Sequence, residues 1–158
     1  MGVRRDAWST RRSGRAGLIL LHLVARGKIG RSAEAELVDR YLKRIPWPTR
    51  VTELPDTGGA APRAQTPMRT VALDETGELL SSVALAERIG RWRDDGVREL
   101  RFLIGAADGL TTDERASADA FLSFGRMTWP HMLARAMLAE QLFRATVILA
   151  NHPYHREG

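Results

Sequence analysis

The chain of 158 residues contains no cysteine. This absence excludes a disulfide-bonded scaffold and a metal site built on thiolates, and it fits a reducing compartment such as the cytoplasm. Only four histidines are present. His152 and His155 have a spacing that suits a metal, but they flank Pro153 and have no cysteine nearby. We therefore expect no metal site.

Long apolar runs are also missing, because no stretch approaches the roughly 20 residues that a membrane span needs. The first 17 residues carry five arginines and one acid ahead of the apolar Leu18–Ala25, a pattern similar to a signal peptide. However, His22 interrupts the apolar run and no small-residue cleavage site follows. We interpret residues 1–17 as a basic, disordered extension, or as the result of a start codon assigned too early. Residues 18–158 are then a single cytoplasmic domain.

Several nucleotide-binding and hydrolase motifs are absent. The chain has neither a GxxxxGK[ST] loop nor a GxGxxG turn, which argues against P-loop and dinucleotide-binding enzymes. It also lacks the GxSxG turn that carries the serine of many hydrolases. The sequence thus gives no support to ATP, NAD or serine hydrolase chemistry.

Charge is unevenly balanced. Lys and Arg number 24 against 19 Asp and Glu, which gives a net charge of +5. A basic protein favours a polyanionic partner, and nucleic acid is the first candidate. We interpret the arginines from 88 to 101 as solvated helix faces rather than an RNA-binding groove. With 44% hydrophobic residues, the chain can bury one core.

Strands and helices alternate along the chain. This order, β-α-β-β-α-β-β-α, predicts an α/β fold with a mainly parallel sheet flanked by helices. The Pro- and Gly-rich segment PDTGGAAPRAQTPM after the second strand predicts a flexible surface loop. Ser32 is expected to cap the first helix, and Pro130 to occupy the first turn of the last one. The expected strands are Leu18–Val24, Arg50–Leu54, Thr70–Leu73, Leu100–Ile104 and Ala120–Phe124, and the expected helices run from Ser32 to Ile45, through Leu85 and Trp92 to Gly96, and from His131 to about Ala150.

Two loops follow strands at the end of the sheet where ligands bind in such folds. The first, GAADGL at Gly105–Leu110, places two glycines around Asp108, and glycine allows a ligand to approach the backbone closely. The second, SFGRMTWPH at Ser123–His131, leads into the N-terminus of a helix, whose free amides favour polar ligands. An ordinary turn and an ordinary capped helix start remain the alternatives.

The last eight residues, NHPYHREG, concentrate aromatic, imidazole and guanidinium groups directly after an apolar helix. Chain ends are normally disordered unless something holds them, so this composition suggests a tail that folds over a site.

These segments carry a resemblance. The runs FLIGAADGL, SFGRMTWPH and LARAMLAEQLFRATVILANHPYHRE closely resemble the ribosomal large-subunit methyltransferase H family, a branch of the SPOUT superfamily. LHLVARGKIG and VDRYLKRIPWPTRVTELPD resemble its first elements, so the similarity extends from Leu18 onward. The resemblance implies a C-terminal trefoil knot, S-adenosylmethionine as cofactor, and a homodimer with each active site at the subunit interface. It also implies no DNA and no membrane among the partners.

The implied reaction is methylation of N3 of a pseudouridine, position 1915, in helix 69 of 23S rRNA in the assembled 70S ribosome. Removal of the N3 proton needs a base or a stabilised anion, for which His131, Glu140 and His155 are candidates. Tyr154 would contact the base, His155 and Arg156 the base or a phosphate, and Arg144 would hold charge nearby. The cofactor residues implied are Leu73, Gly105, Phe124, Gly125, Arg126, Met127, Thr128 and Trp129.

The chain departs from the family pattern in three places. GAADGL stands where relatives usually read closer to GGPEG, and Phe124, Gly125 and Arg126 replace the middle of a segment that often begins SLSKMT. A loop replaces the helix that relatives carry between the second and third strands. These departures leave two alternatives: a non-catalytic RNA- or ribosome-binding dimer, and a methyltransferase with another RNA target. Cofactor binding separates the first from an enzyme, and mapping of methylated nucleotides separates the second.

Overall fold

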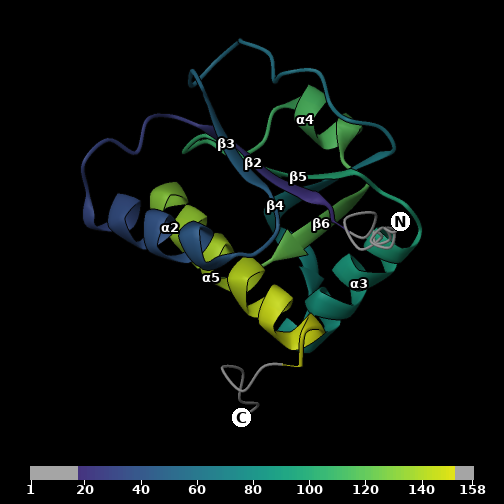
Figure 1. The fold of residues 1–158 in the computed structure, drawn as a ribbon. Helices are drawn as coiled ribbons and strands as arrows, with labels where there is room; N and C mark the ends of the chain where they lie inside the picture. The colour runs from purple at the N-terminus through teal and green to yellow at the C-terminus, as the bar shows by residue number, and fades with distance from the viewer. Residues whose placement is uncertain (1–17, 152–158) are drawn as a thin grey trace, which may run out of the picture.

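The computed structural model describes residues 18–151. Five parallel strands form one sheet in the order β3-β2-β5-β4-β6, with β5 in the centre (Figure 1). This confirms the predicted parallel sheet. The strands are β2 (Leu20–Arg26), β3 (Thr49–Leu54), β4 (Met68–Leu79), β5 (Glu99–Ile104) and β6 (Ala120–Ser123).

Three helices cover one face of this sheet: α2 (Ala33–Arg44), α3 (Ser82–Asp94) and α5 (His131–Leu149). Figure 1 shows α5 crossing this face and meeting both α2 and α3, and both pairs are in contact. The interior between helices and sheet is mainly apolar, as parallel sheets require, with Arg135 of α5 as a buried exception. Its fully buried members include Leu21, Leu23, Leu100, Phe102, Leu138 and Leu142. We call this side the helical face.

The opposite face is covered by the loop of residues 55–67 and the short helix α4 (Thr112–Ser117), which we call the loop face (Figure 1). The loop has no helix or strand, as its composition predicts. Only Val24, Ala72 and Leu103 form a buried apolar cluster on this side. Loop carbonyls are instead bonded by buried guanidinium groups: Arg26 donates to Pro55 O and Gly58 O, and Arg101 to Pro62 O.

A buried carboxylate organises the loop face. Glu99 Oε2 accepts hydrogen bonds from His22 Nδ1 at 2.8 Å and from Arg101 Nε at 2.5 Å, and Glu99 Oε1 accepts one from the Gln65 amide at 2.9 Å. His22 Nε2 lies 2.7 Å from the Thr52 hydroxyl. Burial opposes the charged form of Glu99, but the bonds from Arg101, Gln65 and His22 lower its pKa below the usual value. Burial lowers the pKa of His22.

Several boundaries differ from the sequence prediction. β2 continues to Arg26, because Glu114 pairs with the buried guanidinium at 2.9 Å. β4 continues to Leu79, whereas the predicted strand ended at Leu73. Pro130 precedes the first turn of α5 instead of lying in it. α4 was not predicted, although Thr111 and Glu114 form a capping box that marks its start. The Ser32 cap is confirmed.

None of the helices within residues 18–151 combines the length and the apolar character needed to cross a membrane.

Candidate functional site

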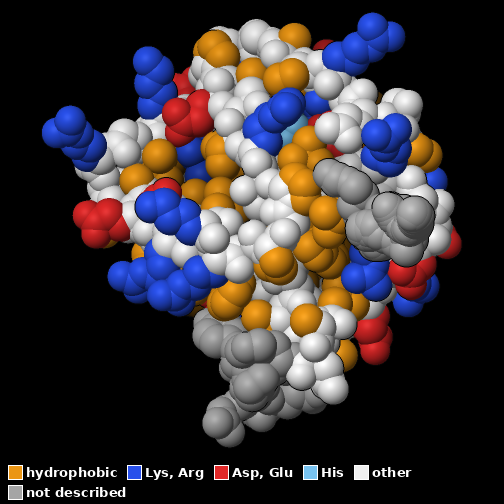
Figure 2. Space-filling view, in the orientation of Figure 1, with side chains coloured by type: hydrophobic (Ala, Val, Ile, Leu, Met, Phe, Trp, Pro, Cys, Tyr) orange, Lys and Arg blue, Asp and Glu red, His pale blue; other side chains and the backbone are white. Residues whose placement is uncertain are grey.

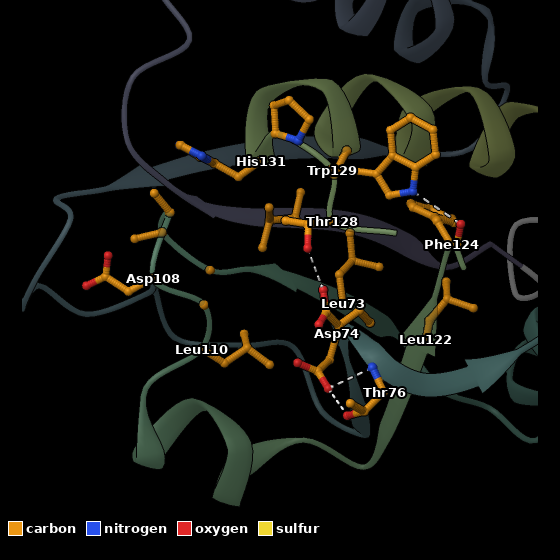
Figure 3. A pocket seen from close by; sticks show the side chains of 18 of the residues that line it. Leu73, Asp74, Thr76, Asp108, Leu110, Leu122, Phe124, Thr128, Trp129 and His131 are labelled. Carbon is orange, nitrogen blue, oxygen red and sulfur yellow. Dashed lines mark hydrogen bonds between the residues drawn. The ribbon is translucent and has the colours of Figure 1, made fainter. Parts of the chain in front are cut away.

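Three loops meet at the edge of the neighbouring strands β4, β5 and β6 where β5 and β6 end, and a cavity of about 680 Å³ lies between them and the start of α5 (Figure 3). This volume lies in the range of pockets that hold cofactors. The position agrees with the rule that ligands of parallel sheets bind beyond the carboxyl ends of strands.

The first loop is an excursion within β4. Leu73 and Glu78 both pair with Leu122 of β6, so residues 74–77 leave the strand and return to the same register position. A Cβ at Gly77 would lie 2.7 Å from the backbone of Phe121, so only glycine allows the returning chain to pass this close. The excursion places three polar side chains, of Asp74, Glu75 and Thr76, at the cavity.

Asp74 is fixed as a carboxylate at the cavity wall. The Thr76 hydroxyl and amide donate to its Oδ2, and Arg115 Nη2 donates to its Oδ1 at 2.8 Å. The bond from the Thr76 side chain, followed by that from Arg115, lowers the pKa of Asp74 below its usual value. Figure 3 shows Asp74 beside Leu73 and Thr76 at the bottom of the pocket.

The second loop, residues 105–110, folds tightly on itself. The Gly109 amide donates to the Ala106 carbonyl at 2.8 Å, and Gly109 has a φ of 96°. A Cβ on Gly105 would lie 2.7 Å from the Gly109 backbone. Both glycines are therefore required by the turn itself. Asp108 is exposed at its tip, where it forms part of the cavity lining.

The third loop, residues 124–130, is bonded to the first. The buried Ser123 hydroxyl lies within hydrogen-bond distance of the carbonyls of Glu75 and Gly125, at 3.1 and 2.9 Å, and accepts from the Gly125 amide. The Thr128 hydroxyl donates to Glu75 Oε2 at 3.1 Å. These contacts fix the relative position of the two loops across the cavity. Trp129 Nε1 donates to Phe124 O at 3.3 Å.

The start of α5 is held by Arg135, which is 1% exposed. Its Nη1 donates to Glu53 Oε2 at 2.5 Å and its Nη2 to the Gly27 carbonyl at 3.1 Å. Although burial opposes ionisation of Glu53, the bond from Arg135 lowers its pKa. One turn earlier, His131 reaches the edge of the cavity. In Figure 3 the His131 ring points to the side opposite Trp129.

The structure brings most of the expected cofactor residues to one cavity. Seven of the eight line it, the exception being the exposed Arg126, whose neighbours on both sides contribute. The seven are Leu73, Gly105, Phe124, Gly125, Met127, Thr128 and Trp129. Of the expected catalytic residues, His131 joins them.

Glu140 and Arg144 lie elsewhere on α5. Arg144 Nη2 donates to Glu140 Oε2 at 2.5 Å, one helical turn away. Glu140 lines a second cavity of about 510 Å³, which shares Leu122, Phe124 and Gly125 with the first. Phe124 and Gly125 thus stand between the two spaces. Tyr154, His155 and Arg156 fall outside the described residues.

Sequence reasoning missed the excursion of residues 74–77 and the anchor Arg135. The available signal for the excursion was Asp74 two residues before Thr76, a spacing typical of a side chain that bonds the backbone in a turn. For Arg135 no local signal existed, because its partners are far away in the chain. Within residues 18–151, no group of three or more histidines and acids could hold a metal ion.

A family model described as "Predicted SPOUT methyltransferase" matches residues 19–155, nearly the whole chain and all three loops. The chain belongs to the SPOUT methyltransferase family. It is therefore a methyltransferase with S-adenosylmethionine as its cofactor, and the cavity of the three loops is the candidate cofactor site of this SPOUT domain.

The chain is also similar to curated proteins of one name within this family. It is 66% identical to "Ribosomal RNA large subunit methyltransferase H" of Rhizorhabdus wittichii over 140 residues, covering 89% of this chain and all of that protein. It is 68% identical to the protein of the same name from Novosphingobium aromaticivorans over 141 residues, with the same coverage. The chain thus belongs to the branch that the resemblance indicated.

Among solved structures, the fold is similar to a probable methyltransferase from Bordetella pertussis Tohama I, with a TM-score of 0.56 at 12% identity, covering 84% of this chain and 98% of that one. It is also similar to the SpoU methyltransferase AviRb from Streptomyces viridochromogenes, in complex with AdoMet, with a TM-score of 0.51 at 13% identity, covering 84% and 62%. At these identities the similarity concerns the fold alone.

Proposed function

We propose that this SPOUT methyltransferase transfers the methyl group of S-adenosylmethionine to 23S rRNA, at N3 of the pseudouridine at position 1915 in helix 69 of the 70S ribosome. The observation that carries the proposal is the cavity in which Leu73, Gly105 and the 124–129 segment meet. The name shared by relatives at 60–68% identity supports ribosomal RNA as the substrate. A cytoplasmic location follows from this substrate.

The residues around the cavity fit the cofactor. Leu73, Ile104 and Leu122 offer an apolar surface for an adenine ring. The carboxylates of Asp74 and Glu75 suit the positive charges of a sulfonium and an ammonium group. When bound, the cofactor supplies a methyl group that is already activated for transfer.

The remaining task of the chain is to align the acceptor and to manage one proton. N3 must lose its proton, and the candidate bases lie in different places. His131 is at the cofactor cavity, whereas Glu140 is paired with Arg144 beyond Phe124. We therefore favour His131 over Glu140 among the described candidates. Tyr154, His155 and Arg156 keep their proposed roles in covering the base.

The proposal includes a homodimer and a knotted C-terminal half. Apolar side chains reach the surface around the two cavities, with Leu79 62%, Met127 74% and Trp129 41% exposed. Figure 2 shows hydrophobic side chains on the surface of the helical face. A second copy of the chain would cover these groups and bring its own α5 to the site. Sedimentation velocity tests the dimer, and Met127→Asp, which puts a charge into the proposed interface, should shift it toward monomer.

The decisive experiment incubates the protein and labelled S-adenosylmethionine with 70S ribosomes from a strain that lacks this methyltransferase. Mapping of the methylated nucleotide by mass spectrometry should place one methyl group on the pseudouridine at position 1915. His131→Ala and His155→Ala are compared in the same assay, and the residue that acts as base should lose turnover while keeping cofactor binding. A methyl group on another nucleotide would contradict the proposed target, and cofactor binding with no RNA methylation would contradict the activity.

A further inference from the structure

Both ends of the sheet carry acidic side chains, including Asp95 and Asp119 at the amino end. At the carboxyl end, Asp74, Glu75 and Asp108 line the cofactor cavity. A polyanionic substrate is repelled by such a wall rather than attracted to it. We therefore expect phosphates of the RNA to contact other parts of the surface.

The amino end of the sheet is a continuous edge in the structure. The Leu20 amide donates to the Arg98 carbonyl at 2.9 Å, and the Arg98 amide donates to Pro67 O at 2.8 Å. On the other side, the Leu21 amide donates to Pro48 O at 3.0 Å. The segments that lead into β2, β3, β4 and β5 thus lie side by side, with Arg98 just before the central strand.

Five exposed arginines belong to this edge. Two of them lie in the last turns of helices, two lie at the starts of strands, and Arg98 precedes the central strand. None of the five has a carboxylate within 4 Å in the part of the chain that the structure describes. We call them the basic edge: Arg44, Arg50, Arg69, Arg91 and Arg98.

Several arginines around the carboxyl end are paired, although the exposed Arg31 and Arg126 have no carboxylate within 4 Å among the described residues. Arg88 bonds Glu78, Arg115 bonds Asp74, and Arg135 bonds Glu53. A guanidinium that is bonded to a carboxylate has few free N–H donors for a phosphate, whereas an unpaired guanidinium keeps all of its donors.

The arginines from 88 to 101 therefore do not share one environment, and the interpretation of all of them as solvated helix faces was wrong. Arg101 is buried on β5. Arg93 stacks over Trp47 at 5.6 Å and bonds Asp94. Only Arg91 and Arg98 of this stretch belong to the basic edge.

Helix ends do not explain this distribution. A cation in the last turn complements the helix dipole, which accounts for Arg44 and Arg91. It does not account for Arg50, Arg69 and Arg98, which come from three different chain segments and meet at one edge. Convergence of unpaired cations from separate segments is the arrangement that phosphate backbones bind.

We propose that the basic edge binds phosphates of the ribosomal RNA at a place separate from the methyl acceptor. The inference rests on the proposed function and adds the second contact with its substrate. A six-residue strand such as β5 spans roughly 20 Å, at about 3.3 Å per residue. A target that reaches both the cavity and the basic edge must therefore extend over at least about this distance.

The test measures the affinity for 70S ribosomes by cosedimentation across a series of salt concentrations. The double variant Arg91→Ala/Arg98→Ala removes two cations of the edge, and Arg63→Ala, an exposed arginine in the loop face without a carboxylate partner, is the matched control. Each lost phosphate contact should lower the slope of log affinity against log salt by about 1, and weaken binding about fivefold to tenfold near 0.1 M salt. Arg63→Ala should leave the salt slope and the affinity for ribosomes unchanged.

Methylation is measured on the same samples. The double variant should raise KM for ribosomes and leave kcat and the affinity for S-adenosylmethionine unchanged. The proposal that the basic edge binds RNA would be overturned if log affinity fell with log salt equally steeply for the double variant and the natural chain. It would also be overturned if Arg63→Ala weakened ribosome binding as much as the double variant does. If the natural chain binds ribosomes but methylates no RNA, the proposed function fails, while the slopes still judge the basic edge.

Discussion

The two faces of the sheet are stabilised by different physical means. On the helical face, helices satisfy their own backbone groups, so burial of apolar side chains such as Phe102 and Leu138 is sufficient. On the loop face, the segment of residues 55–67 leaves backbone carbonyls and amides without partners of their own. Buried charged side chains of the sheet supply them: Arg26, Glu99 and Arg101 bond the loop directly. A loop can thus cover a sheet where charges replace the missing helix.

The largest loss of stability is expected for Phe102→Ala, which removes a fully buried ring from the centre of the helical face. We expect the free energy of unfolding to fall by about 3–5 kcal/mol, through lost burial and the cavity left behind. Because no titratable group is involved, the loss should be the same at neutral and mildly acidic pH. Urea unfolding at both values checks it, and a loss confined to acid would contradict an apolar face.

The second is Glu99→Gln on the loop face. It keeps the size of the side chain but leaves the buried Arg101 without a counter-charge, which should lower the free energy of unfolding by about 3 kcal/mol. The bond from Gln65 weakens as well, so trypsin should cleave faster at Arg63 in the loop. Glu87→Gln, an exposed carboxylate of α3, is the control. An unchanged cleavage rate would show that Glu99 does not hold the loop.

The third variant tests the cofactor cavity, whose loops are held by buried hydrogen bonds as the loop face is. Ser123→Ala removes the hydroxyl that links Glu75 to Gly125. We expect the affinity for S-adenosylmethionine to fall about tenfold, because a hydrogen bond of this kind contributes about 1 kcal/mol and its loss leaves buried groups unpaired. Calorimetry measures it, with the exposed Ser117→Ala as control. Equal affinities for both variants would mean that this hydroxyl does not order the loops.

The smallest expected effect is a dependence of stability on pH that comes from the loop face. Burial lowers the pKa of His22 below its ordinary 6.5, so below that pH the unfolded chain binds more protons than the folded one. The stability of the fold should therefore fall on acidification, by at most about 1.4 kcal/mol per pH unit from this group. Glu99, whose pKa is also lowered, adds to the loss at more acid pH. His22→Gln should make the free energy of unfolding depend less steeply on pH between about pH 7 and about pH 5. An unchanged dependence on pH would contradict His22 as the titrating group.

The helical face was largely predictable from the sequence, and the loop face was not. The predicted helix from His131 to about Ala150 is α5, which buries Leu138 and Leu142, and Ser32 marked the start of α2 correctly. These signals are local. The pairing of His22 with Glu99 joins residues 77 apart in the chain, so no window of sequence reveals it.

The candidate site was also only partly predictable from the sequence: two of its three loops were predicted and one was missed. The loops at 105–110 and 123–131 stood out because they follow strands and carry glycines, and they do line the cavity. The excursion at 74–77 was missed because its polar residues also resemble the end of a strand. Only the return of the chain at Glu78 to the register of Leu73 distinguishes the two, and that depends on pairing with β6.

The most direct test of the account is a calorimetric titration of the purified protein with S-adenosylmethionine, beside the variant Gly105→Val. The added side chain would meet the Gly109 backbone and force the 105–110 loop to move. The account predicts one cofactor bound per chain for the natural protein and none for the variant, whose thermal unfolding shows that it is still folded. Binding of equal strength by both proteins would contradict a cofactor site built on this loop.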